Sequence, residues 1–328
     1  MFYQLANELN LKIILNHLLC CYNITYMWLF FFFPLAISFL VNLVFEKTAL
    51  RFGFVDVAKG DALKIHHRPI PYVGGVAMFV AAALSLLFMA PPDMRPLFFG
   101  VVLAALPVLA LGFWDDMKWK HQTQAKPFLK FAFLILIPLL AATILWIAGW
   151  RLDFPSFFLF VPASAFAIFV LMNSINYQDG MDGLAGSLTA VSFGGFAIVS
   201  FLLGNSLDLI LSLAFMGAVL GFLALNLPPA RMFMGDSGAY VLGFFLALLV
   251  LLFIRMDAAG ALLLAGFPLA EGIWTNCRRL MQGKSIFYGD RSHVYDRMLQ
   301  AGLSPWKTLA FLIMIQIALV GTGILLFI

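Results

Sequence analysis

Long apolar runs separated by short polar connections dominate the pattern of this chain. Runs of about 20 apolar residues are the signal of membrane-crossing helices. The two weakest runs are 184–204, interrupted by Gly194-Gly195, and 258–276, interrupted by Pro268 and Glu271. Because Glu271 is ionisable and lies at membrane depth, we expect it to face protein or a water-filled cleft. The pattern predicts about ten helices, at residues 28–50, 72–91, 97–114, 128–149, 156–176, 184–204, 207–226, 238–255, 258–276 and 306–327.

The composition agrees with a membrane protein. Hydrophobic residues make up 63% of the chain and charged residues only 11%, whereas about 25% of the residues in soluble domains are charged. We therefore predict an all-α polytopic membrane protein in which residues 28–328 form a single integral-membrane domain. Residues 1–27 form a weakly apolar tail without a convincing signal-peptide layout, and translation from Met27 is an alternative start.

Lysine and arginine residues are concentrated in alternate connections between the predicted helices. The odd-numbered connections share one membrane face, and the even-numbered ones hold only Arg95, Arg151 and Arg255. The positive-inside rule therefore predicts that the odd connections are cytoplasmic and that both termini lie outside. The odd connections and their flanks also hold most of the Asp, Asn and His residues that lie between the predicted helices. We expect active-site loops on the cytoplasmic face of the inner cell membrane.

The connection after the fifth predicted helix carries amide and carboxylate side chains at a spacing of three residues. Such groups beside apolar helices are costly unless something charged or strongly polar meets them, although a polar inter-helix turn is the structural alternative. Asn173 and Asn176 would share a face of the last helical turn. The intervening glycines disfavour an unbroken helix through Asp182. The residues are Asn173, Asn176, Asp179 and Asp182, interleaved with Gly180 and Gly183.

Two other odd connections carry candidate catalytic carboxylates. Asp115 and Asp116 follow the third predicted helix, and Asp236 stands between glycines just before the eighth. Neighbouring helical residues point about 100° apart, so Asp115 and Asp116 are expected to have distinct roles rather than to share one ion equally. A solvated acidic cap is the alternative for this pair, and a helix cap is the alternative for Asp236. Asn and Asp oxygens suit Mg²⁺ rather than zinc.

Basic side chains complete the set of candidate residues. His67 precedes Gly74-Gly75, Lys126 lies at the start of the fourth predicted helix, and Arg291 and His293 lie in the last odd connection. Forked guanidinium and single imidazole donors suit phosphate or pyrophosphate groups. A solvated basic loop at the membrane surface is the alternative.

Taken together, the five odd connections resemble those of the polyprenyl-phosphate N-acetylhexosamine-1-phosphate transferase family, glycosyltransferase family 4. The resemblance implies transfer of a sugar-1-phosphate from a UDP-sugar to polyprenyl phosphate, with release of UMP and a need for Mg²⁺. The matching segments are, in order, His67-Arg-Pro-Ile-Pro with Gly74-Gly75, Gly112-Phe-Trp-Asp115-Asp116 with Lys126, Asn173-Ser-Ile-Asn-Tyr-Gln-Asp179-Gly-Met-Asp182-Gly, Phe233-Met-Gly-Asp236-Ser-Gly and Asp290-Arg-Ser-His293.

The resemblance also implies roles for individual residues. Asn176 and Asp236 match the Mg²⁺-ligating positions, and Asp182 matches the position that recognises uracil. Lys126 matches a phosphate contact, and Asp115 and Asp116 match the pair held essential for turnover, which we group with Asp236 as catalytic. The remaining residues expected to bind substrate are His67, Asn173, Asp179, Arg291 and His293.

The last motif departs from the family pattern. The family usually continues His-Ile-His-His, whereas His293 is followed here by Val294, Tyr295 and Asp296. The run of three histidines of the lipid I synthase is also absent, which argues against a phospho-N-acetylmuramoyl-pentapeptide donor. An inactive family member used for binding is a third interpretation, which the retained carboxylates of the other motifs oppose.

The expected function is therefore transfer of N-acetylhexosamine-1-phosphate as the first membrane step of a cell-envelope polysaccharide. The expected partners are a UDP-N-acetylhexosamine, undecaprenyl phosphate and the lipid bilayer, without nucleic acid, and a homodimer is left open. The alternatives are the phospho-N-acetylmuramoyl-pentapeptide transferase activity and a lipid transporter or flippase. A transporter would place polar residues along its helices and on both faces, and no inverted repeat is evident here.

Overall fold

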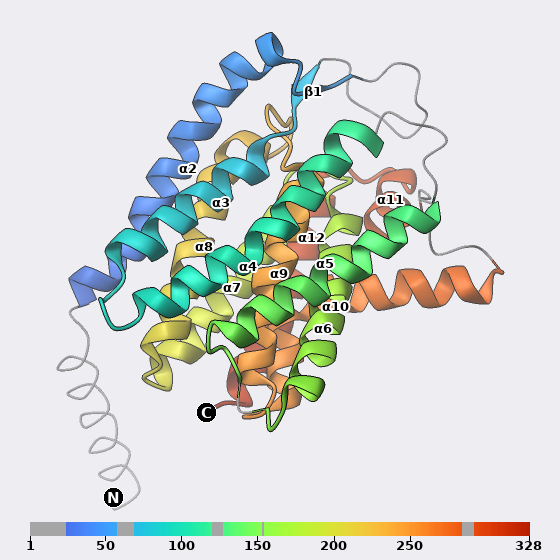
Figure 1. The fold of residues 1–328 in the computed structure, drawn as a ribbon. Coiled ribbons are helices and arrows are strands. Elements are labelled where there is room, and N and C mark those ends of the chain that lie inside the picture. The colour runs from blue at the N-terminus through green and yellow to red at the C-terminus, as the bar shows by residue number, and fades with distance from the viewer. Residues whose placement is uncertain (1–23, 58–68, 120–126, 153, 284–291) are drawn as a thin grey trace, which may run out of the picture.

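Helices account for nearly all of the described structure (Figure 1). The computed structural model describes residues 24–57, 69–119, 127–152, 154–283 and 292–328. A two-residue antiparallel ladder is the only sheet in these ranges, with Val55 opposite Pro71 and Asp56 opposite Ile70. The elements are α2 (Ile24–Phe52), β1 (Val55–Asp56), β2 (Ile70–Pro71), α3 (Gly74–Leu84), η1 (Ser85–Met89), α4 (Arg95–Trp114), η2 (Asp115–Trp119), α5 (Pro127–Ile147), α6 (Phe157–Gln178), α7 (Leu184–Leu202), α8 (Ser206–Asn226), α9 (Gly235–Phe253), α10 (Ala258–Met281), α11 (Val294–Gln300) and α12 (Pro305–Leu325).

Each predicted span coincides with one helix of the bundle. Within the described ranges, nine helices are long and apolar enough to cross a membrane, and the span at 72–91 is a shorter helix, Gly74–Met89. In that helix, α3 passes directly into η1, a wider π-helical segment, and α4 passes in the same way into η2. The protein is an all-α, multi-pass membrane protein. The location of its termini relative to the membrane stays a prediction.

The two weakest predicted spans differ in outcome. Helix α7 is unbroken, and Gly194 and Gly195 are part of it. Helix α10 bends at Gly266, which has φ 24° and ψ −111°, two residues before Pro268. The side chain of Gln316 on α12 bridges the bend: its Oε1 accepts from the Phe267 N–H at 2.7 Å. The bend therefore depends on a neighbouring helix as well as on the local Gly and Pro.

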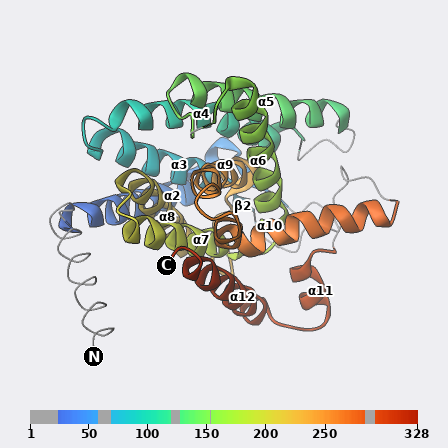
Figure 2. The same ribbon diagram turned by 90° about the horizontal axis from the view of Figure 1, so that it is seen from below.

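Helix α9 forms the centre of the bundle. Figure 2 shows it surrounded by other helices, with α3, α6, α8 and α10 around it. Its side chains are buried along almost its whole length, as expected for a helix that is apolar on every side. Phe245 of α9 stacks on Phe215 of α8 with ring centroids 3.7 Å apart. Any residue at the end of α9 is therefore held within a rigid frame.

Two glycines let α3 and α4 approach the first turn of α9 closely. A Cβ at Gly75 would lie 2.2 Å from the Cα of Gly238, and one at Gly112 would lie 2.5 Å from the Cα of Ser237. The Gly75 N–H also donates to the carbonyl of Met234 at 2.9 Å. Gly75 thus contacts the segment that carries Asp236.

We predict that Gly75→Ala will lower stability by about 1–3 kcal/mol, because the new methyl group overpacks a backbone-to-backbone contact. Thermal unfolding in detergent micelles measures this effect. The matched control is Gly321→Ala on α12, where a Cβ meets nothing within 4 Å, so its midpoint should be unchanged or raised. Equal midpoints for Gly75→Ala and the parent chain would contradict the prediction.

Candidate active site

The loops that carry the sequence motifs meet at one end of the bundle. In Figure 1, β1 and α11 lie at this end, whereas the C-terminus lies at the other. The first turn of α9 is the meeting point, since it contacts η2 through Asp116 and the end of α6 through Asn176. The Phe233 N–H just before it donates to the carbonyl of Pro71 in β2 at 2.8 Å. Motifs far apart in the sequence thus form one site.

Asp116 holds the start of α9. Its Oδ1 accepts from the Asp236 N–H at 2.9 Å and its Oδ2 accepts from the Ser237 N–H at 3.1 Å. The first N–H groups of a helix have no partner within the helix, and a carboxylate also suits the positive end of the helix dipole. Gly235 has φ +71°, and a Cβ there would lie 2.5 Å from Asp116 Oδ2. Asp116 therefore fixes the backbone that presents Asp236.

Asp115 faces different partners. Its Oδ2 accepts from the Tyr240 hydroxyl at 2.9 Å and forms an ion pair with Lys130. Its carboxylate also interacts directly with that of Asp236. The divergence expected for two successive helical residues is thus observed. Lys130 was not selected as a site residue from the sequence. A lysine in the first turn of a membrane helix was nevertheless a signal that it has an acidic partner.

Asn176 and Asp236 come together as the sequence motifs imply. The Asn176 Nδ2 donates to Asp236 Oδ1 at 2.7 Å across a sequence separation of 60 residues. Helix α6 ends at Gln178, two residues past Asn176, so the expected break before Asp182 is confirmed. Asn173, one turn earlier, donates to the carbonyl of Phe169 in its own helix at 2.7 Å.

The donor set at this position fits a divalent, oxygen-preferring cation. Asp115 and Asp236 bring two carboxylates against the single ammonium of Lys130, and the Asn176 amide adds a neutral oxygen. Within the described ranges no cluster of three His, Cys, Asp or Glu side chains has the arrangement of a metal cage. An open site with few protein ligands is what Mg²⁺ uses when substrate phosphates and water complete its shell.

Asp182 anchors the loop between α8 and α9. Its Oδ2 accepts from the Ala230 N–H at 2.9 Å. On the same loop, Arg231 forms a bidentate pair with Glu46 of α2, with both N–O distances 2.7 Å. Asn226 accepts from the Gly183 N–H at 3.1 Å and so joins this loop to the start of α7. Sequence reasoning did not select Glu46, Arg231 or Asn226, whose partners lie far away in the chain.

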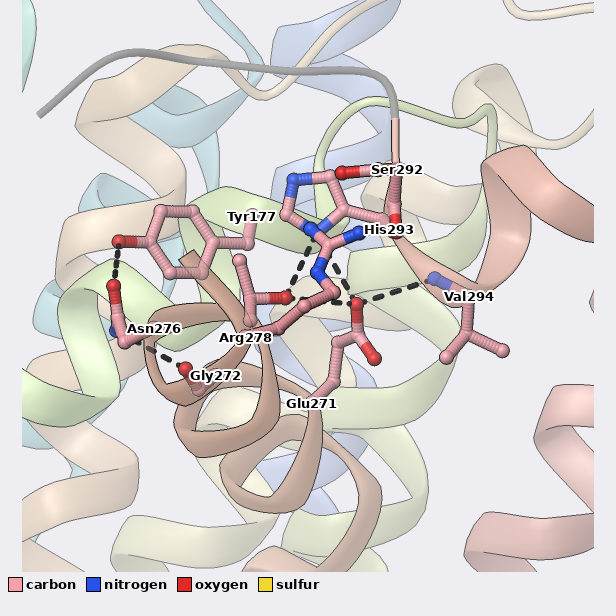
Figure 3. Close-up of polar contacts among 9 residues, drawn as sticks. Tyr177, Glu271, Gly272, Asn276, Arg278, Ser292, His293 and Val294 are labelled. Carbon is pink, nitrogen blue, oxygen red and sulfur yellow. Dashed lines mark hydrogen bonds and ion pairs between the residues drawn. The ribbon is translucent and has the colours of Figure 1, made fainter. Parts of the chain in front are cut away.

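The last motif lies beside the end of α6. His293 is buried, and its ring lies 5.5 Å, centroid to centroid, from that of Tyr177, the neighbour of Asn176. Its Nδ1 lies 3.1 Å from Oε1 of Glu271 (Figure 3). Glu271 is buried and faces protein, which confirms one of the two expectations for it. Asp179 is partly buried at the end of α6.

Three predicted phosphate contacts, His67, Lys126 and Arg291, lie outside the described residues. Their roles therefore stay predictions.

Residues 98–254 match the profile of the family described as glycosyl transferase family 4. The match includes every predicted carboxylate of the site. Similar sequences extend over most of the remaining chain, as the relatives below show. This segment of the chain belongs to glycosyl transferase family 4.

Three curated relatives, all from bacteria, show how far the similarity extends. A probable undecaprenyl-phosphate N-acetylglucosaminyl 1-phosphate transferase of Bacillus subtilis is 28% identical, over 82% of this chain and 78% of the relative. The undecaprenyl-phosphate alpha-N-acetylglucosaminyl 1-phosphate transferase of Thermotoga maritima is 29% identical, over 84% and 83%. The enzyme of the same name from Yersinia pestis is 28% identical, over 89% and 83%.

We predict unequal effects on stability for the two adjacent carboxylates. Asp116→Asn replaces an acceptor with an NH₂ group that faces a backbone N–H, which should cost about 1–3 kcal/mol. Asp115→Asn keeps an acceptor for Tyr240, and the weaker pairing with Lys130 is offset by relief of the repulsion from Asp236, so its unfolding midpoint should fall less than that of Asp116→Asn. Thermal unfolding of both variants in the same detergent measures the difference, and equal destabilisation would contradict the assigned roles.

A further prediction concerns Gly180, on the loop between α6 and α7. A Cβ there would lie 2.0 Å from the hydroxyl oxygen of Tyr295 and 3.0 Å from its Cζ. Gly180→Ala should therefore reduce folding or activity, and Tyr295→Phe in the same chain should restore part of the loss, because it removes the closest atom. Absence of any recovery in the double variant would show that this contact is unimportant.

Proposed function

We propose that this protein transfers N-acetylhexosamine-1-phosphate from a UDP-sugar to polyprenyl phosphate, as the first membrane step of a cell-envelope polysaccharide. The observation that carries the proposal is the meeting of Asn176, Asp236 and Asp115 at one end of the bundle. Family membership and the names of the relatives support undecaprenyl phosphate as acceptor and N-acetylglucosamine as the sugar to test first. They favour this function over a muramoyl-pentapeptide donor or a flippase.

The reaction is a phosphoryl transfer, which needs mainly positioning and charge neutralisation. A phosphate monoester has its second pKa near ~6, so the acceptor is mostly dianionic at neutral pH. A phosphate oxygen of the polyprenyl phosphate attacks the β-phosphorus of the UDP-sugar, which bears the sugar. The bond from this phosphorus to the bridging oxygen breaks, and UMP leaves with that oxygen. The product is a polyprenyl diphosphate sugar.

The residues of the site divide this work. Asn176 and Asp236 would hold Mg²⁺, which neutralises pyrophosphate charge when bound. Asp115, paired with Lys130, orients the acceptor phosphate or takes its residual proton. Asp116 keeps the first turn of α9 in place beneath Asp236.

The remaining predicted residues bind the two ends of the donor. Asp182 and its loop shape the uridine side, and Asn173 on α6 and Asp179 directly after α6 complete the predicted donor contacts. The basic residues neutralise the phosphate charge that Mg²⁺ at the carboxylate site would leave. These are His67, Lys126, Arg291 and His293.

The proposal includes an orientation in the cell. Lysine and arginine are concentrated in the odd-numbered connections of the sequence, which carry the motifs, so the positive-inside rule supports a site open to the cytoplasm and termini outside. The membrane would be the inner, cytoplasmic one, where a UDP-sugar is delivered.

The test measures UMP release by the purified protein with undecaprenyl phosphate, Mg²⁺ and a panel of UDP-sugars. UMP should appear with a UDP-N-acetylhexosamine, fall to background with EDTA and return with added Mg²⁺. Mutations around metal ligands cost about 10- to 100-fold in affinity, so Asn176→Ala should raise the Mg²⁺ needed for half-maximal rate at least ~10-fold. Folded protein that releases no UMP from any sugar would overturn the proposal.

A further inference from the structure

Glu271 is a buried carboxylate that the proposed reaction does not use. It lies on α10 just after the bend at Gly266, and only 3% of it is exposed. Ionisable residues at membrane depth are costly and usually mark functional positions. Its surroundings therefore need an explanation beyond packing.

One oxygen of Glu271 lies within hydrogen-bond distance of three donor groups (Figure 3). Its Oε1 lies 3.1 Å from Thr275 Oγ1, 3.1 Å from His293 Nδ1 and 3.2 Å from the Val294 N–H. A carboxylate only accepts hydrogen bonds, so the hydrogen of the imidazole must be on Nδ1. The other ring nitrogen, Nε2, lies on the side of the ring that faces away from Glu271.

The plane of the His293 ring is fixed by aromatic neighbours. Tyr177 lies 5.5 Å away on a plane tilted by 34°, and Tyr295 lies 5.6 Å away and is nearly parallel, at 3°. Tyr177 is itself held, because its hydroxyl donates to Asn276 Oδ1 at 3.1 Å and the guanidinium of Arg279 lies 5.2 Å from its ring centroid. The carboxylate thus sets the rotation of the imidazole and the tyrosines set its plane.

This arrangement explains the departure in the last motif. Tyr295 stands where the family pattern has its second histidine, and here it stacks on His293 and packs its hydroxyl against Gly180. Gly180 belongs to the loop between Asp179 and Asp182. Tyr295 therefore supports the ring of His293 from the position of the replaced histidine.

We propose that Glu271 is a positioning residue that holds His293 with Nδ1 protonated and Nε2 directed at a phosphate group of the substrates. The inference rests on the proposed function, because it names what positions one of its phosphate-binding residues. Carboxylates that hold the second nitrogen of a functional histidine fix its tautomer and orientation, and their loss costs about 10- to 100-fold in metal sites built this way. We expect a loss of similar size in kcat.

A double-mutant cycle tests whether Glu271 acts through His293. Glu271→Met keeps the side-chain length and removes the acceptor, and should lower kcat about 10- to 100-fold. In a His293→Gln chain the same change should cost less than about 2-fold, because the group that it positions is gone. If Glu271→Met lowers kcat by the same factor in the His293→Gln chain as in the parent chain, the proposal is overturned. Glu271→Gln keeps an acceptor oxygen and should recover part of the activity of Glu271→Met.

Asp208→Asn is the matched control. Asp208 is also a carboxylate with little exposure, but it lies in the first turn of α8, at the opposite end from the site. Its replacement should leave kcat within about 2-fold of the parent, since it tests only the loss of a buried charge. A loss as large as that of Glu271→Met would indicate a general structural effect and overturn the assigned role.

A spectroscopic measurement keeps the inference testable without activity. In ¹⁵N NMR of histidine-labelled protein, His293, assigned by comparison with His293→Gln or His293→Asn, should carry hydrogen on Nδ1. In Glu271→Met the signals should shift toward the Nε2–H form. Hydrogen on Nε2 alone in the parent chain would overturn the inference. If the parent releases no UMP but shows the expected tautomer, the proposed function fails and the pairing stands.

Discussion

The site depends on one buried contact, the carboxylate of Asp116 with the N–H groups of Asp236 and Ser237. A helix that begins inside a membrane protein has N–H groups that water cannot satisfy. Asp116 satisfies two of them and at the same time joins η2 to α9. The small residues Gly75 and Gly112 make room for the contact. The position of Asp236 follows from this frame.

The acidic side chains of the site serve two physical purposes. Asp116, Asp182 and Glu271 accept hydrogen bonds from the protein and hold loops or side chains in place. Asp115 and Asp236 meet each other instead, and Lys130 forms an ion pair with Asp115. Carboxylates gathered this way repel each other, and a bound cation relieves that repulsion. The scaffold and the chemistry thus use the same residue types in different surroundings.

Helix positions were predictable from the sequence because membrane-crossing length and apolar content are local properties. The ten predicted spans all coincide with helices, including α7 despite Gly194 and Gly195. The bend of α10 was indicated by Pro268, but its stabilisation depends on Gln316 of α12. Partners such as Glu46 for Arg231 were equally hidden, since an ion pair between distant segments leaves no local pattern.

By itself, the sequence determined the class of protein, the helices and the motif residues, because hydrophobic length, charge bias and the order of motifs can be read along the chain. Tertiary structure decided which side chains meet. It brought Asn176 to Asp236 across 60 residues and gave Asp115 and Asp116 separate partners. It also paired His293 with Glu271. Such contacts depend on how helices pack against one another, and packing is a property of the whole bundle.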